Sequence, residues 1–128
     1  MAIYADDIII DKKDQLQRIE NICLDDEIIR AVFDLKGRGT GFVGITDKRI
    51  IYYDKAFLKD KKALVSIPHS RISSVASEDN KGFLIKSGFT ISDTLTISTA
   101  GLGPKTFEFR GGDKAHTAHN IIMEYLLV

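Results

Sequence analysis

An alternation of apolar and polar residues, running from about position 28 to position 110, constrains this chain more than any other feature. Successive side chains of a β-strand point to opposite faces, so a period of two predicts strands with one buried face. Short strands at regular spacing, separated by glycine-rich or polar turns, predict a small antiparallel barrel or sandwich. The predicted strands cover 28–35, 42–46, 49–53, 63–67, 72–75, 94–98 and 106–110.

Two stretches have helical spacing instead. Between Asp11 and Leu24, apolar side chains fall three or four positions apart, with Asp11 as the expected N-cap. After Gly111-Gly112, we expect Asp113 to cap a final helix that plugs one end of the barrel. The apolar positions of the two predicted helices are Leu16, Ile19, Ile22 and Cys23, and Ala115, Ala118, Ile122, Tyr125 and Leu126.

These patterns predict a mainly β chain with an extra N-terminal helix. We expect an acidic helical arm over residues 1–26, followed over residues 27–128 by a barrel domain that includes the C-terminal helix. Within the barrel, residues 78–92 are expected to form a hairpin-like excursion. The 128 residues leave room for one domain of ordinary size.

Composition narrows the class of protein. With 44% hydrophobic and 28% charged residues, the chain can bury an ordinary core and is not disordered. The single cysteine, Cys23, forms no internal disulfide and is expected to be a packing residue in a reducing compartment, which favours the cytoplasm. The first residues are acidic rather than basic, and no apolar run approaches the roughly 18 residues of a spanning helix.

Charge is balanced overall but not along the chain. Lys and Arg total 18 and Asp and Glu total 18, which gives no general attraction to nucleic acid. Residues 1–27 carry eight acids and three bases, net −5, whereas residues 36–62 carry eight bases and three acids, net +5. One interpretation is a solvated surface with no special role. The other is that the acidic segment meets the basic one, within one chain or on a neighbouring subunit.

Two motifs carry a resemblance to a known family. The segment Thr46-Asp47-Lys48-Arg49-Ile50-Ile51-Tyr52-Tyr53-Asp54-Lys55, followed by Val65-Ser66-Ile67-Pro68-His69-Ser70-Arg71-Ile72, resembles the bacterial pleckstrin-homology (PH) domain family. The similarity covers roughly residues 27–127 in the family's order. It implies a barrel of seven antiparallel strands capped by a C-terminal helix, and a family with no established catalytic activity.

No catalytic, metal or cofactor site is predicted. His116 and His119 have the spacing of neighbours on a helix, but no third metal ligand accompanies them. The glycine-rich segment 37–41 joins two strands and lacks the Lys-(Ser/Thr) of a P-loop. No nucleophile elbow is present. We interpret Asp25-Asp26-Glu27 as solvated loop charge.

Four bases near the first hairpins could attract anionic phospholipid headgroups. They are Lys36, Arg38, Lys48 and Arg49. The resemblance raises this question because many eukaryotic PH barrels bind headgroups there, but their Arg-x-Arg on the second strand is missing from residues 42–46. We expect Lys48 and Arg49 to lie at a solvated turn, so that replacing both with alanine leaves the fold intact.

The sequence therefore favours a non-catalytic interaction or assembly module that forms a homo-oligomer and binds a protein partner of unknown identity. The expected interface residues are Leu16, Ile19, Ile22, Phe83 and Leu84. The first alternative is a peripheral binder of anionic phospholipid headgroups at a membrane, and the second is an enzyme using His116 or His119. Measurement of the oligomeric state distinguishes the assembly hypothesis from these alternatives.

Overall fold

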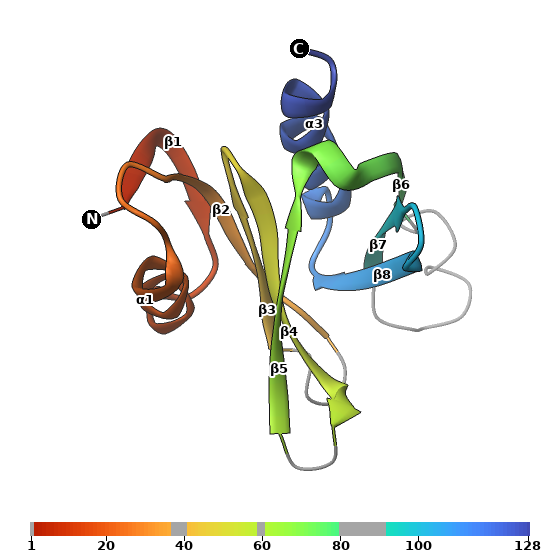
Figure 1. Ribbon diagram of the computed structural model, residues 1–128, viewed down its shortest axis with the longest axis horizontal. Coiled ribbons are helices and arrows are strands. Elements are labelled where there is room, and N and C mark those ends of the chain that lie inside the picture. The colour runs from red at the N-terminus through yellow and green to blue at the C-terminus, as the bar shows by residue number, and fades with distance from the viewer. Residues whose placement is uncertain (1, 37–40, 59–60, 80–91) are drawn as a thin grey trace. The chain divides into compact units, whose positions relative to one another are not determined.

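A computed structural model describes residues 2–36, 41–58, 61–79 and 92–128 (Figure 1). It confirms a mainly β chain with two helices in the described part. The chain falls into two compact units, Met1–His69 and Ser70–Val128, which are described separately below. In chain order the elements are β1 (Ile3–Ile10), α1 (Lys13–Ile22), β2 (Ile28–Asp34), β3 (Phe42–Thr46), β4 (Arg49–Leu58), β5 (Lys61–Pro68), η1 (His69–Arg71), β6 (Ile72–Asp79), β7 (Ser92–Thr99), β8 (Gly103–Arg110) and α3 (Lys114–Leu126).

The first unit contains a five-stranded sheet in the order β1-β2-β3-β4-β5 (Figure 1). Strands β2 to β5 pair antiparallel in succession, as the sequence predicts for a meander. β1 pairs parallel with β2, and a register shift interrupts this pairing between Tyr4 and Ile9. This strand was not predicted, because the pair Asp6-Asp7 breaks the alternation within it.

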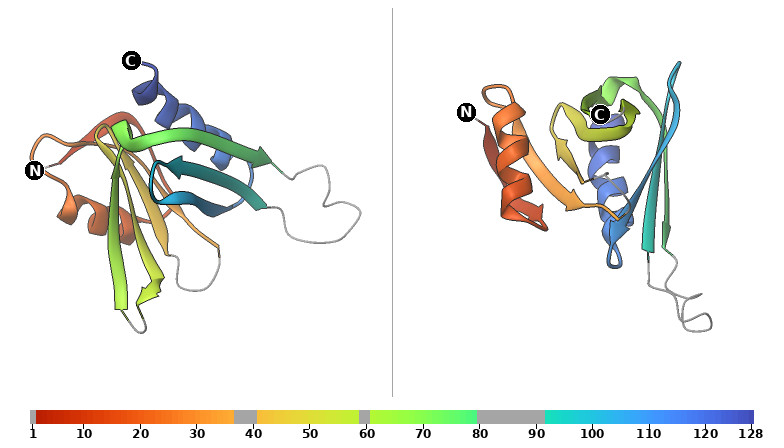
Figure 2. Two further views of the ribbon diagram at one scale, coloured as in Figure 1. Left: turned by 45° about the vertical axis from the view of Figure 1, so that its right-hand side comes forward. Right: turned by 90° about the horizontal axis from the view of Figure 1, so that it is seen from below.

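Helix α1 packs on the sheet of its own unit, where Figure 2 shows it beside β2. Ile19 is completely buried in the cluster beneath the helix, and Leu16, Ile22 and Cys23 lie at its margin. The apolar face of the predicted helix is thus covered within the chain. The buried members of this cluster are Ile19, Ile29, Val32, Phe42 and Ile51.

A β-bulge in β2 changes which of its side chains face the apolar cluster beneath α1. The register with β3 shifts between Ile29 and Ala31, so the strict alternation predicted for residues 28–35 is broken there. Ile29 and Val32 consequently join the same cluster, although they are three positions apart. Ala31 and Phe33 are completely buried as well. β2 is therefore buried on both faces over most of its length, and the prediction of a half-buried strand is wrong.

The start of α1 differs from the predicted cap. The N-cap residue is Lys12, and its side chain forms no capping hydrogen bond. Asp11, the predicted cap, instead accepts a hydrogen bond at Oδ2 from the backbone N–H of Asp34, at 2.8 Å. Asp14 lies in the first turn, where it interacts favourably with the helix dipole, as expected.

The second unit contains a three-stranded antiparallel sheet in the order β6-β7-β8, against which α3 packs (Figures 1 and 2). Ala115, Ala118 and Ile122 of the predicted stripe are completely buried. Asp113 is the N-cap residue, with φ of 68°, but its side chain does not cap the helix. The completely buried carboxylate of Asp93 in β7 takes this role and accepts hydrogen bonds from two backbone N–H groups, those of Lys114 (2.7 Å) and Ala115 (3.3 Å).

Other expectations concern the closure of the barrel and its connecting segments. Hydrogen bonding among residues 2–36, 41–58, 61–79 and 92–128 forms two open sheets, not the single closed barrel that was predicted. The turn at 37–41 and the excursion at 78–92 fall mostly on residues 37–40 and 80–91, which lie outside the described residues. Neither described helix has the length and apolar character that crossing a membrane requires.

Candidate functional site

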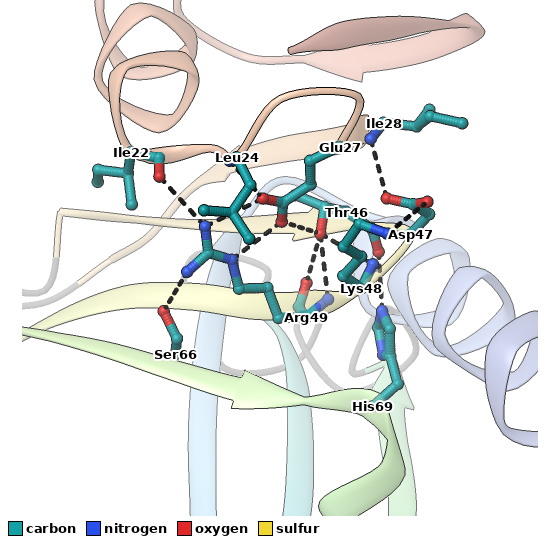
Figure 3. Close-up of polar contacts among 10 residues, drawn as sticks. All are labelled: Ile22, Leu24, Glu27, Ile28, Thr46, Asp47, Lys48, Arg49, Ser66 and His69. Atoms are coloured by element: carbon teal, nitrogen blue, oxygen red, sulfur yellow. Dashed lines mark hydrogen bonds and ion pairs between the residues drawn. The ribbon is translucent and has the colours of Figure 1, made fainter. Parts of the chain in front are cut away.

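A buried carboxylate in the first unit accepts hydrogen bonds from two residues of the segment 46–55 (Figure 3). The Glu27 side chain is 0% exposed and accepts four hydrogen bonds. Arg49 donates from Nε to Oε2 at 2.9 Å and from Nη2 to Oε1 at 3.0 Å. The Thr46 hydroxyl donates to Oε2 at 2.6 Å, and the backbone N–H of Leu24 donates to Oε1 at 2.9 Å. Because its charge is paired and hydrogen-bonded, this carboxylate can remain ionised inside the protein.

The guanidinium of Arg49 joins four segments of the unit. Besides Glu27, it donates from Nη2 to the backbone oxygen of Ile22 at 3.2 Å, at the end of α1. It also donates from Nη1 to the Ser66 hydroxyl on β5, at 3.1 Å (Figure 3). Its side chain is only 18% exposed. Arg49 therefore ties the end of α1 and the start of β2 to β4 and β5, which a lysine with its single ammonium could not do.

Thr46 organises the turn between β3 and β4. Its hydroxyl oxygen accepts hydrogen bonds from the backbone N–H groups of Lys48 and Arg49, each at 3.1 Å, while its proton goes to Glu27. Its backbone oxygen lies 2.7 Å from Nε2 of the buried His69. Since a carbonyl only accepts, Nε2 of His69 carries a proton. We call Glu27, Thr46, Arg49 and His69 the motif network.

Burial and hydrogen bonding shift the titration of this network. Burial by itself raises the pKa of Glu27, but the hydrogen bonds from Arg49, Thr46 and Leu24 outweigh it and hold the pKa below its ordinary value. The hydrogen bond to Glu27 raises the pKa of Arg49. Burial lowers the pKa of His69, and its bond to Thr46 only partly opposes this. The folded state therefore favours an ionised Glu27 beside a neutral His69.

Acidification is expected to destabilise the protein in two steps. Both groups bind protons more readily in the unfolded chain, so the free energy of unfolding falls as pH decreases. The contribution of His69 begins to fall below its ordinary pKa of 6.5 and is lost as pH falls through its lower pKa in the folded state. The contribution of Glu27 falls in the same way below its ordinary pKa of 4.5. Urea unfolding across this range measures both steps. Glu27→Gln should lack the second step, and an unchanged step in that variant would contradict the assignment.

Two expectations about charged residues are wrong. Arg49 does not lie at a solvated turn, and Glu27 is not solvated loop charge, because the two form the buried ion pair described above. The alternation of inward-facing and outward-facing positions in a strand could have indicated this pairing. Glu27 precedes β2 in the same parity as the buried Ile29, so an inward-facing carboxylate should have required a buried cation.

The bases considered for anionic lipid differ in their surroundings. The Arg49 guanidinium donates two hydrogen bonds to the Glu27 carboxylate, and Lys36 is half-buried. The Lys48 side chain is about half exposed, with Nζ 4.0 Å from a carboxylate oxygen of Asp47. Arg38 lies outside the described residues. Hence Lys48 is the one exposed base of this set that the described ranges place at the turn.

The expected interface residues are either buried to differing degrees beneath α1 or outside the described residues. Ile19 is completely buried under α1, and Leu16 and Ile22 are half-buried against the same cluster. Phe83 and Leu84 lie outside the described residues. Burial within the chain therefore leaves only the margins of the α1 stripe available to a partner.

The edges of the five-stranded sheet expose apolar side chains that sequence reasoning missed. On β1, Ile3, Tyr4 and Ile9 are 47%, 46% and 38% exposed. On β5, at the opposite edge, Leu64 is similarly exposed. β1 also contains Asp6 and Asp7, whereas β5 begins with two lysines. Each of the two strands thus has at least one exposed apolar side chain, and their sequences carry charges of opposite sign.

The remaining groups to consider are the Cys23 thiol and possible metal ligands. Cys23 is half-buried, and burial is the main cause that raises the pKa of its thiol to about 11, in keeping with a packing role. Within the described ranges, no three side chains of the types His, Cys, Asp and Glu gather into a group that could hold a metal ion.

Comparison with known proteins gives one family match. Residues 23–125 match the family model described as "Bacterial PH domain". This span includes the motif network, both of the motifs named above and all of α3 except its last residue. No curated protein and no solved structure matches the chain.

Proposed function

Because the chain belongs to the bacterial PH domain family, we propose that it is a non-catalytic interaction module that assembles with further copies of itself. PH domains are in general binding modules rather than enzymes. The single observation that carries the proposal is the edge strand β1, on which Ile3, Tyr4 and Ile9 are exposed. An edge strand offers unpaired backbone donors and acceptors, and exposed apolar side chains add area to a contact made there.

Charge favours a head-to-tail contact over pairing between two β1 strands. Two β1 strands side by side would bring Asp6 and Asp7 close to the same acids of the other copy, and opposed like charges destabilise paired strands. β5 begins with Lys61 and Lys62 and has the complementary sign. The proposed contact therefore joins β1 of one copy to β5 of the next.

Strand direction is compatible with this contact. β1 is parallel to β2, and three successive antiparallel pairings lead to β5, so β1 and β5 run in opposite directions. A copy added in the same orientation would place its β5 antiparallel to β1. Contacts of this head-to-tail kind produce a ring where the rotation closes and a filament where it does not. The register shift within β1 limits regular pairing, so we expect micromolar affinity.

Sedimentation of the chain at low and high salt tests the proposal. We expect the mass to exceed that of the monomer at tens of micromolar and low salt, and to fall as salt screens the contact. A monomer throughout this range would overturn the proposal. In that case vesicle co-sedimentation with and without phosphatidylserine tests the lipid-binding alternative, for which Lys36, Arg38 and Lys48 are the candidate bases besides Arg49, which is paired with Glu27.

Charge reversal identifies the edges. Asp6→Lys/Asp7→Lys and Lys61→Glu/Lys62→Glu should each be monomeric alone, because each then carries two edges of one sign. Mixing the two variants should restore association, since each supplies the edge that the other lost. Asp14→Lys/Asp25→Lys is the matched control, because it makes the same charge change at exposed acids off the strand. Association that survives either edge reversal would contradict the β1–β5 contact.

A further inference from the structure

Two histidines and a serine converge in the second unit, apart from the elements used by the proposed association. The Ser77 hydroxyl on β6 lies 2.7 Å from Nδ1 of His116 and 2.8 Å from Nδ1 of His119. The two histidines are three positions apart on α3, so their rings lie on one side of the helix. His116 is exposed, whereas His119 and Ser77 are half-buried. Two imidazole nitrogens thus face one oxygen at a place that solvent reaches.

One hydroxyl proton cannot satisfy two nitrogen acceptors. Ser77 can donate to one imidazole only, so the other must carry a proton on Nδ1 and donate it to the hydroxyl oxygen. The two rings therefore hold different tautomers, or one of them is charged. A cation that accepts both Nδ1 lone pairs would instead allow both rings to hold the same tautomer, with the proton on Nε2.

We propose that His116 and His119 chelate a divalent transition-metal ion through their Nδ1 atoms, with the Ser77 hydroxyl as a weak oxygen ligand. Neutral imidazole suits Cu²⁺, Ni²⁺ and Zn²⁺. Metal–nitrogen bonds of about 2.0–2.1 Å, the lengths found with Zn²⁺, are shorter than the present distances to Ser77. An ion held by both nitrogens must therefore replace the present hydrogen bonds to the Ser77 hydroxyl.

The site is open and its affinity is modest. The described residues provide no third His, Cys, Asp or Glu for it, so water completes the coordination sphere. A closed structural zinc site has four protein ligands, which this site lacks. Affinity for nitrogen sites rises along the series to Cu²⁺, so Cu²⁺ should bind more tightly than Ni²⁺ or Zn²⁺. We expect a micromolar dissociation constant for Cu²⁺ and a tenfold or greater weakening for Ni²⁺.

Paramagnetic broadening tests the site in the unmodified chain, without an affinity tag. The chain has three histidines, His69, His116 and His119. Substoichiometric CuCl₂ should broaden the ring signals of His116 and His119 and leave those of the buried His69 sharp. Calorimetry with CuCl₂ should give one ion per chain. An absence of saturable binding, or broadening that spares the α3 histidines, would overturn the proposal.

Variants separate metal binding from a purely structural hydrogen-bond cluster. His116→Gln and His119→Gln should each weaken Cu²⁺ binding at least tenfold, whereas Ser77→Ala should weaken it by less. Ser73→Ala is the matched control on the same strand, since the Ser73 hydroxyl donates to the backbone oxygen of Ser98. Cys23→Ser should bind Cu²⁺ like the wild type, because the thiol is not a ligand of the proposed site. If the histidine variants melt like the wild type and bind Cu²⁺ equally well, the assignment is wrong.

Discussion

Replacing Arg49 with alanine is expected to lower the free energy of unfolding by about 3–5 kcal/mol, because the Glu27 carboxylate then remains buried without its cation. The loss exceeds that of an exposed ion pair, which is typically worth about 0–1 kcal/mol. Urea unfolding at neutral pH measures the change. The control is Lys48→Ala at the adjacent position, whose side chain is about half exposed and whose loss should change stability by no more than about 0.5 kcal/mol.

Three further variants test the reason for this loss. Arg49→Lys should recover only part of the stability, since an ammonium cannot reproduce the paired bonds to Oε1 and Oε2 of Glu27. Removing both charges, as in Glu27→Leu/Arg49→Met, should cost less than Arg49→Ala alone because no buried charge is left over. A third variant, Glu27→Gln, leaves a guanidinium that is partly exposed, so it should also cost less. Equal stability of Arg49→Ala and Lys48→Ala would show that the pair contributes nothing.

The motif network changes how the basic residues of this family pattern are interpreted. In the segment Thr46-Asp47-Lys48-Arg49, the threonine and the arginine both bind Glu27. Asp47 accepts a hydrogen bond at Oδ1 from the backbone N–H of Ile28, at 2.8 Å, and so fixes the start of β2. Three of the four motif residues are therefore occupied in holding one end of the sheet together. In this chain their presence is evidence for a local structure, not for headgroup binding.

The strands other than β1 were predictable from the sequence because the signal for each is local. The run 42–46 after a glycine-rich turn and the alternation in 94–98 depend only on neighbouring positions, and β3 and β7 include these segments. The apolar spacing of α1 and α3 is local in the same way. Pro68 ends β5 as expected, because it has no backbone N–H to donate to a further strand.

The parts that the sequence did not predict depend on distant partners. The β1 strand has an interrupted alternation and forms by pairing parallel with β2, across the intervening α1. The cap of α3 comes from Asp93, about twenty residues before the helix, and not from the adjacent Asp113. The Ser77 contact of His116 and His119 likewise joins β6 to α3. Local propensity cannot indicate which distant strand supplies such a partner.

The packing of α1 on β3 provides the second prediction of large effect. Ile19→Ala should lower the free energy of unfolding by about 2–5 kcal/mol, because Ile19 is completely buried and its loss leaves a cavity. Gly44 lies directly opposite. A Cβ atom added there would lie 2.7 Å from Cδ1 of Ile19 and 3.0 Å from its Cγ1. Gly44→Ala alone should therefore cost about 1–3 kcal/mol through overpacking.

The two substitutions should compensate each other when combined. In Gly44→Ala/Ile19→Ala the new methyl group occupies space that the isoleucine vacated, so the double variant should be more stable than the sum of the single effects implies. Urea unfolding of the four proteins gives the coupling energy. Arg18→Ala, at an exposed position of the same helix, controls for changes in helix propensity. Strictly additive losses would mean that α1 does not approach β3 through Ile19 and Gly44.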